Sequence, residues 1–426
     1  MIKKLKSFAK TDLIKTSFFT SIATIVKIAT AFVLNKVVAV YVGPVGVALI
    51  GQFTNFFGII ITIGSGGINN GIIKYIAENR DNETNTRKII STSFWLMVLC
   101  SLISGLILFL FADYFTILLF KSQEYKFVLN LISLSLLFAS LNSLLMSILN
   151  GHKEVKKYTS ANIITSLLIL VLSILLVASY KLQGVLIALV AGQSLVFFIT
   201  LLFVLRCHWF KVSYFFRYLD KGILKNLSKY SIMTIVSSLT GPVALLIIRN
   251  YIGTNLSWEA AGYWQGVYSI SDVYLMFITT SLGVYYLPRI SEIKEPKELR
   301  QEILSTSKIV LPIAALMAFV VYLCRIPLTL LLFTVGFKPM LSLFKYQLLG
   351  DVIKLACWLI SFQMIAKSMT KLFIFTEMLF SLSFVVLAIF LINFFGLEGT
   401  TIAFCINYSL YFIFLIIYFR KQLFQT

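Results

Sequence analysis

Long apolar runs separated by short polar segments follow one another along the whole chain. Each window of about twenty apolar residues can cross about 30 Å of hydrocarbon as a helix. Because the runs are continuous and do not alternate, the pattern predicts membrane helices and not a β-barrel. We predict twelve spans, six in each half, at residues 16–41, 44–74, 88–112, 126–150, 157–179, 182–205, 228–251, 259–288, 303–324, 340–364, 370–394 and 398–419.

The second half of the chain repeats landmarks of the first half in the same order. Tyr41-Val42-Gly43 and Tyr251-Ile252-Gly253 each end an apolar run, 210 residues apart. Leu182-Gln183-Gly184 recurs as Leu397-Glu398-Gly399 at an offset of 215. A duplicated unit of membrane helices places a cavity on its pseudo-symmetry axis, as in transporters with a substrate site near mid-membrane. We therefore expect two lobes, 1–206 and 230–426, joined by a cytoplasmic interfacial linker at 207–229.

Composition supports an all-α integral membrane protein. Hydrophobic residues make up 59% of the chain and charged residues 13%, against roughly 45–50% and 25% in soluble domains. No cleavable signal peptide is expected, because the first apolar run is too long for one. The net charge of +20 needs no nucleic-acid partner, since basic loops that face anionic lipid head groups account for it.

The distribution of lysine and arginine predicts the orientation in the membrane. With the N-terminus in the cytoplasm, most basic residues fall in inside segments, so both termini are predicted to be cytoplasmic. The outside segments then hold only Lys121, Lys126, Lys181, Arg249, Arg325, Lys338 and Lys345.

Motifs for catalysis and for cofactors are missing from the sequence. The run Gly64-Ser65-Gly66-Gly67 lacks the further glycine of a dinucleotide fingerprint and lies inside a span, where it predicts a bend or close helix packing. The five scattered cysteines suggest neither a disulfide nor a metal site. His152 and His208 stand alone, which favours structural roles. We expect no enzyme activity, no metal and no cofactor beyond a coupling H⁺ or Na⁺.

Two charged residues lie near the middle of predicted spans, where each costs at least about 2.5–3.5 kcal/mol. Lys27 is flanked by apolar residues in the first span; it faces either an anionic substrate in a cavity or a structural partner. Asp272 lies at the centre of the eighth span. It binds a coupling ion or pairs with a lysine of the other lobe.

Five more charged residues that bear on function fall within or at the ends of spans. Asp351 and Lys354 share one face of the tenth span, so mutual neutralisation is favoured over a role in ion coupling. Glu377, in the eleventh span, is a candidate second ion site. Lys74 and Arg249 lie near span ends, where snorkelling is the simpler explanation and a place at the cavity mouths the alternative.

Pro242 in the seventh span and Pro312 in the ninth predict kinks, because proline removes a helix donor. A kink at Pro242 fits a gate and static packing equally well.

The stretch Gly262-Tyr263-Trp264-Gln265-Gly266-Val267-Tyr268-Ser269-Ile270-Ser271-Asp272 resembles the Wzx flippases. Val26-Lys27-Ile28, Gly43-Pro44-Val45-Gly46, Asn70-Gly71-Ile72-Ile73-Lys74-Tyr75 and Gly350-Asp351-Val352-Ile353-Lys354 are similar to the same family. The resemblance runs over nearly the whole chain. It implies the fold of the larger flippase and multidrug-antiporter superfamily, in which two six-helix lobes face a central cleft.

The resemblance also implies a cargo: an undecaprenyl-diphosphate-linked oligosaccharide, moved from the cytoplasmic to the periplasmic leaflet by alternating access. The expected diphosphate ligands are Lys27, Lys74 and Arg249. Polar side chains suited to a sugar cavity are Gln52, Asn55, Asn69, Asn70, Tyr268 and Tyr274. An O-antigen unit and a common-antigen unit fit equally well, and a polymerase and a chain-length regulator are expected associates by resemblance only.

Three rival functions remain. A multidrug cation antiporter of the same superfamily is disfavoured because Lys27 would repel cationic drugs. A lipid II flippase is disfavoured because fourteen spans are expected of that family, whereas twelve are predicted here. A membrane polysaccharide polymerase or ligase would need a large periplasmic loop with catalytic residues, whereas the predicted outside loops are short.

Overall fold

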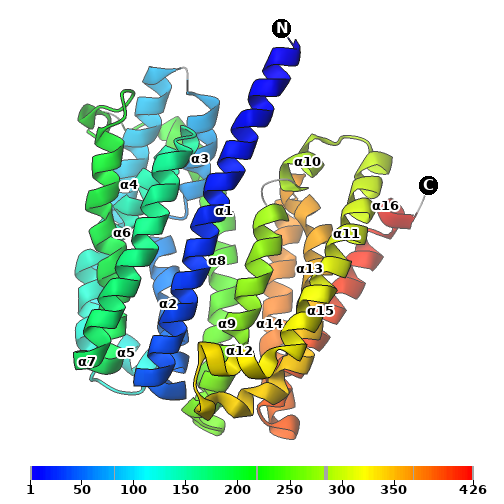
Figure 1. The fold of residues 1–426 in the computed structure, drawn as a ribbon. Helices are drawn as coiled ribbons and strands as arrows, with labels where there is room; N and C mark the ends of the chain where they lie inside the picture. Colours follow the sequence, from blue (N-terminus) through cyan, green and yellow to red (C-terminus); the bar gives the residue numbers. More distant parts are fainter. Residues whose placement is uncertain (1, 81, 217–218, 283–285, 368, 425–426) are drawn as a thin grey trace. The chain divides into compact units, whose positions relative to one another are not determined.

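The computed structural model describes residues 2–80, 82–216, 219–282, 286–367 and 369–424, and these residues form helices without a strand (Figure 1). The long helices of the first half are α1 (Ile2–Tyr41), α2 (Gly43–Gly64), α4 (Glu83–Leu110), α6 (Lys126–Gly151) and α7 (Val155–Leu205). Those of the second half are α8 (Lys221–Asn255), α9 (Trp258–Ser281), α11 (Pro296–Leu323), α13 (Phe344–Ala366), α14 (Thr370–Phe395) and α15 (Glu398–Tyr418).

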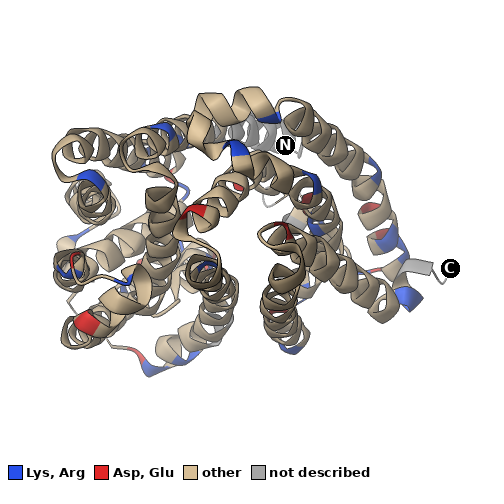
Figure 2. Ribbon diagram, turned by 90° about the horizontal axis from the view of Figure 1, so that it is seen from below, with Lys and Arg blue, Asp and Glu red and all other residues tan. Residues whose placement is uncertain are grey.

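Shorter helices connect the long ones. They are α3 (Asn69–Glu78), α5 (Ala112–Phe120), η1 (Val212–Tyr214), α10 (Leu287–Glu292), α12 (Arg325–Leu332), η3 (Val335–Leu343) and α16 (Arg420–Phe424). Most of the ribbon carries neither sign of charge (Figure 2). This distribution is expected where long helices face lipid, because an unpaired charge there is costly.

Ten helices among the described residues are long and apolar enough to cross a membrane, which confirms the predicted helical membrane fold. Helix α7 counts once, although its 51 residues form two helical segments joined at Lys181, where φ is 46° and ψ is −127°. The second segment folds back along the first, since a Cβ atom added to Gly192 would lie 2.4 Å from Ile169 Cγ1. Helix α9 is not among the ten, and it carries Glu259, Gln265 and Asp272. The number of twelve spans remains a prediction.

The chain divides into two compact units. Unit 1 comprises Met1–Tyr41 and Phe56–Ser238, and unit 2 comprises Val42–Asn55 and Leu239–Thr426. The first half of α2 therefore groups with unit 2, and the first half of α8 with unit 1. The lobe boundaries expected from the sequence, 1–206 and 230–426, remain a prediction.

The core of unit 1 forms where α3 packs against α6. Ile68, Ile72 and Ile76 recur every four residues and are fully buried, in one cluster with Leu144 and Ile148 of α6. This spacing places them on one face of the helix. The chain reaches α3 through Gly66 and Gly67, whose φ angles of 64° and 62° favour glycine. The glycine run thus separates α2 from α3, which confirms the bend predicted in the second span.

The segment between α7 and α8 is bound to α4 of unit 1. Lys211 Nζ lies 3.2 Å from Glu83 Oε1, and the Tyr214 hydroxyl donates a hydrogen bond to the same oxygen. Ser91 Oγ donates to the carbonyl oxygen of Phe215 over 3.2 Å. Arg217 and Tyr218, in the predicted linker, lie outside the described residues. The described part of the linker is therefore fixed to one unit by its own polar groups.

Close backbone approaches shape unit 2. A Cβ atom added to Gly262 of α9 would lie 2.0 Å from the carbonyl oxygen of Pro44, and one added to Gly350 of α13 would lie 2.4 Å from the Phe404 ring of α15. Both glycines stand in the sequence blocks on which the family resemblance rests. Pro242 and Pro312 lie inside α8 and α11, which continue past them.

His152 occupies the turn after α6 in unit 1. Its ring stacks on Trp209 at a centroid distance of 3.7 Å, and Trp209 Nε1 donates to Glu154 Oε1 over 3.1 Å. Burial, with a smaller contribution from the charge of Arg80, lowers the pKa of His152 to about 4. The folded chain therefore holds this imidazole neutral at pH values where the unfolded chain protonates it.

We expect acid to destabilise the protein partly through His152. Between about pH 6.5 and pH 4 the unfolded chain binds a proton that the folded chain does not, so the free energy of unfolding falls as the pH falls through this window. The variant His152→Phe should keep the stack and show a smaller drop in melting temperature from pH 7 to pH 5. His208→Phe is the matched control, since it removes an exposed histidine outside the stack; equal pH profiles for both variants would contradict the assignment.

Candidate functional site

Several charged side chains of unit 2 interact electrostatically with Lys354 of α13. The Lys354 side chain is 8% exposed, and Asp351, one turn earlier, is fully buried. The ammonium of Lys354 interacts electrostatically with three carboxylates: Asp351 of α13, Asp272 of α9 and Glu377 of α14. The four residues expected from the sequence to take part in ion coupling are thus brought together in one unit.

Asp351 is held by neutral donors. Its carboxylate accepts hydrogen bonds from the hydroxyl groups of Ser271 and Tyr274 of α9, at 2.7 Å for Tyr274, and from Gln347 Nε2 at 3.2 Å. Asp351 and Lys354 do not form a direct ion pair in the described structure, although their charges attract each other. The expectation that the two residues neutralise each other therefore remains a prediction. The i, i+3 spacing places the two residues on one helix face, but three donors already occupy the carboxylate.

Lys354 lies in a cage of aromatic rings. Its Nζ atom is 5.0 Å from the ring centroid of Trp358, 5.7 Å from that of Phe404 and 5.8 Å from that of Tyr408. Each ring presents a negative face to the ammonium, and such contacts strengthen when water is excluded. The rings therefore replace part of the hydration that Lys354 loses on burial.

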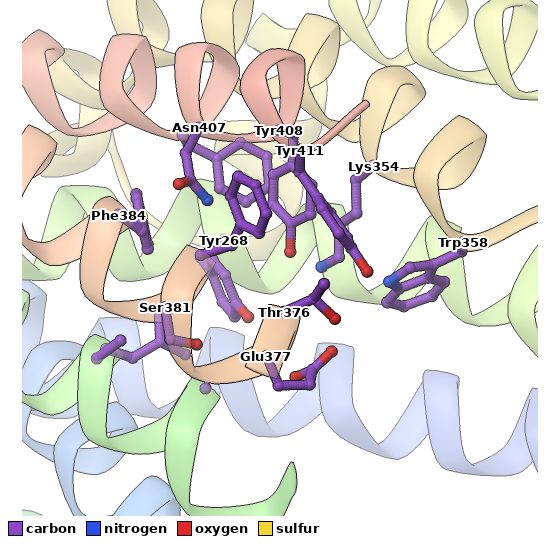
Figure 3. A pocket seen from close by; sticks show the side chains of 15 residues that line it. Tyr268, Lys354, Trp358, Thr376, Glu377, Ser381, Phe384, Asn407, Tyr408 and Tyr411 are labelled. Carbon is purple, nitrogen blue, oxygen red and sulfur yellow. The ribbon is translucent and has the colours of Figure 1, made fainter. Parts of the chain in front are cut away.

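A cavity of about 110 Å³ opens beside this cage (Figure 3). Its polar lining includes Lys354, Glu377, Thr376, Asn407 and the hydroxyl-bearing rings of Tyr268, Tyr408 and Tyr411. Asn407 is 4% exposed, and its Oδ1 atom has no hydrogen-bond partner in the protein. A cavity of this size and polarity has room for a few water molecules or a small hydrated ion.

The charge balance of the cluster is negative when all groups are ionised. Three carboxylates face one ammonium, and Asp272 is exposed on the surface of unit 2 whereas Asp351 is not. Unbalanced charge in an apolar surrounding is relieved by binding a proton or another cation. The cluster is therefore chemically suited to bind and release a cation.

A second cluster of buried side chains surrounds Arg249, which lies near the end of α8. Its side chain is 1% exposed, so the snorkelling expected from the sequence is wrong. The guanidinium donates to Gln52 Oε1 of α2 over 3.3 Å and to Gln265 Oε1 of α9 over 2.5 Å, and it lies 5.6 Å from the Trp264 ring centroid. The side chain is covered because it packs against α9 and against the first half of α2. The position of Arg249 in the sequence does not predict these contacts.

The other candidates for substrate contact differ in their surroundings. Lys27 of α1 is exposed at mid-helix, and Lys74 of α3 is exposed and lies 3.8 Å from Glu78. Asn69 is within 3.5 Å of Ser65 and Ser147, whereas Asn70 is exposed. The Nδ2 atom of Asn55 is buried without a hydrogen-bond partner. The side chains of Lys27 and Asn70 are thus exposed, whereas those of Gln52 and Tyr274 are buried and already hydrogen bonded.

Several residues of the cavity were not predicted from the sequence, among them Trp358, Thr376, Asn407, Tyr408 and Tyr411. Phe404, Tyr408 and Tyr411 recur at helical spacing in the last long helix, a pattern that ordinarily indicates packing. Only their position opposite Lys354 gives them a role at the charge cluster.

The arrangement of helices is that of a known class of membrane transporter. A multidrug resistance MATE family transporter of the MOP superfamily, in an inward-facing conformation, matches with a TM-score of 0.80 and 15% identity over 94% of this chain and 98% of its own. The lipid II flippase MurJ, in an inward closed conformation, matches with a TM-score of 0.73 and 17% identity, covering 96% of this chain and 87% of its own. These likenesses establish the fold.

Sequence comparison identifies the family. The polysaccharide biosynthesis protein family matches residues 13–294. Proteins named lipid III flippase from Escherichia coli (strain K12) and Shigella flexneri are each 32% identical over 404 residues, which cover 94% of this chain and 96% of theirs. The chain belongs to the polysaccharide biosynthesis protein family, and the relatives carry the names of transporters and not of enzymes.

We expect the Arg249 group to contribute strongly to stability. Arg249→Met leaves the side-chain oxygens of Gln52 and Gln265 buried without their donor, which should lower the free energy of unfolding by about 2–4 kcal/mol. Thermal unfolding in detergent, followed by tryptophan fluorescence, measures the change. Lys345→Met removes an exposed cation from unit 2 and serves as the control. A similar small loss in both variants would show that the contacts contribute little.

We expect Lys354 to neutralise Glu377 across the cavity. Lys354→Met leaves buried carboxylates without their cation and should lower the free energy of unfolding by about 3–5 kcal/mol. Adding Glu377→Gln should restore part of this loss, because one uncompensated charge disappears with it. A double-mutant cycle of melting temperatures measures the coupling. Strictly additive effects of the two substitutions would contradict an electrostatic link between the two side chains.

Proposed function

We propose that the protein is a flippase that moves an undecaprenyl-diphosphate-linked oligosaccharide from the cytoplasmic to the periplasmic leaflet of the bacterial inner membrane. The observation that carries this proposal is the 32% identity to two lipid III flippases over 94% of the chain. The transporter fold and the charge cluster inside an apolar unit support it. A protein that only filled the membrane would have no need of charges at that depth.

The proposed ligand of the diphosphate is Lys27. Its ammonium is exposed at the middle of a membrane helix, where a cation is costly unless it meets water or an anion. Arg249 is a weaker candidate, because two glutamine oxygens already accept from its guanidinium. Lys74 lies beside Glu78, which offsets its charge toward an anionic cargo.

Transport is proposed to be coupled to H⁺ or Na⁺ at the Lys354 cluster. Asp272 and Glu377 both interact electrostatically with Lys354, and the cavity that Lys354 and Glu377 line has polar side chains and room for water. Binding of a cation would change the charge balance of unit 2, and that change would favour one arrangement of the transporter over another. A flip driven only by downstream consumption of the glycolipid is the alternative.

The proposed cargo is either a common-antigen unit or an O-antigen repeat unit, and the two fit equally well; the relatives themselves are named for lipid III. Both termini are proposed to lie in the cytoplasm, and the chain is proposed to work as a monomer, in association with a polysaccharide polymerase and a chain-length regulator. A multidrug cation antiporter is disfavoured, because an exposed lysine at mid-membrane repels a cationic drug.

We expect the gene to restore surface polysaccharide to a bacterial strain that lacks its own flippases of this type. Lys27→Ala should abolish the restoration, whereas Lys27→Arg should retain it, because the proposed role is that of a positive charge facing a diphosphate. Immunoblotting of surface O-antigen and common antigen provides the measurement. The polymer that is restored shows which sugar unit the protein accepts.

The control for the Lys27 series is Lys371→Ala, which removes an exposed lysine at the start of α14. Full restoration by Lys27→Ala would refute the role of that charge. Failure of the unmodified protein, despite verified membrane expression, would point to a different cargo, and binding of the purified protein to undecaprenyl diphosphate would then decide the class of ligand.

A further inference from the structure

An apolar groove crosses the surface of unit 1 beneath the segment that joins α7 to α8. Its volume is about 240 Å³, and every residue that lines it is apolar. The walls come from Phe94 of α4, from Leu141 and Leu145 of α6, and from Leu201 and Leu205 of α7. Val212, Phe215 and Phe216 of the joining segment line its mouth.

The length of the groove along the helices matches the thickness of one leaflet of the bilayer. Leu205 is the last residue of α7, and Phe197, which lies eight residues earlier, also lines the groove. Leu141 stands ten residues before the end of α6. At 1.5 Å per residue, the groove reaches about 12–15 Å from the helix ends, or about half of the 30 Å hydrocarbon thickness. It therefore has the length of the hydrocarbon region of a single leaflet.

The mouth of the groove combines exposed apolar side chains with cations. Val212 and Phe216 are 53% and 63% exposed. Exposed Arg206 directly follows Leu205, and exposed Lys211 directly precedes Val212. An apolar surface beside basic residues at a helix end is typical of the membrane interface, where cations meet anionic head groups.

We propose that this groove binds one acyl chain of an anionic phospholipid, with the phosphate of the head group beside Arg206. The charge of Arg206 favours an anionic over a zwitterionic lipid, whereas the charge of Lys211 is already offset by Glu83. The length of the groove favours an acyl chain over an undecaprenyl chain, which is several times longer than one leaflet is deep. The bound lipid packs against Val212, Phe215 and Phe216, so it holds the joining segment on unit 1 together with the contacts to Glu83 and Ser91.

The proposal is independent of the cargo and is tested with the whole purified protein in nanodiscs of phosphatidylglycerol or phosphatidylcholine. Native mass spectrometry measures the lipid retained after release. The unmodified protein should retain phosphatidylglycerol in preference to phosphatidylcholine. Leu201→Trp fills the groove and should weaken retention about tenfold, the change expected when two methylene groups lose their burial. Leu202→Trp, next to it on the exposed side of α7, should leave retention unchanged.

Two further variants keep the test decisive if Leu201→Trp fails to fold. Val212→Asp places a carboxylate at the exposed mouth and should also weaken retention of phosphatidylglycerol. Arg206→Gln should reduce the preference for phosphatidylglycerol about fivefold, the contribution of one cation at the membrane surface. Equal retention in Val212→Asp and Leu202→Trp, equal retention of the two phospholipids, or recovery of a polyprenyl phosphate in their place would overturn the proposal.

Discussion

A charge inside an apolar helix bundle must be compensated locally, and this constraint organises unit 2. Lys354 would be costly at its depth if it stood alone. Three aromatic rings, three carboxylates and a small polar cavity surround it, contributed by α9, α13, α14 and α15. The glycine at position 350 allows α13 and α15 to approach closely enough for Phe404 to take part. Packing and electrostatics in this unit therefore depend on the same helix contacts.

Polar contacts also decide which segments belong to which unit. The first half of α2 lies in unit 2, where Gln52 accepts from Arg249 and Pro44 meets the backbone of Gly262. The segment between α7 and α8 is bound to unit 1 through Glu83 and Ser91. The boundary between the units in this part of the chain falls inside α8, between Ser238 and Leu239, a few residues before Pro242.

The two buried cations serve different ends. Arg249 is bound by side-chain oxygens that carry no charge, so its hydrogen bonds hold α2, α8 and α9 together. Lys354 makes no direct ion pair in the described structure, and it lines a cavity that is large enough for a few water molecules. The first arrangement suits a structural joint, and the second suits a group whose partners change.

The sequence by itself determined the class of the protein. Apolar run length, low charge and a repeated order of landmarks predicted a helical membrane transporter, because hydrocarbon thickness and backbone hydrogen bonding leave few alternatives. Depth within a run also identified Asp272, Asp351, Lys354 and Glu377 as costly charges. Only the tertiary structure showed that these four share one cluster, that Arg249 is buried between glutamines, and that Asn407 and Tyr408 line the cavity. These facts depend on which helix faces which, and helix rotation is set by packing between segments far apart in the chain.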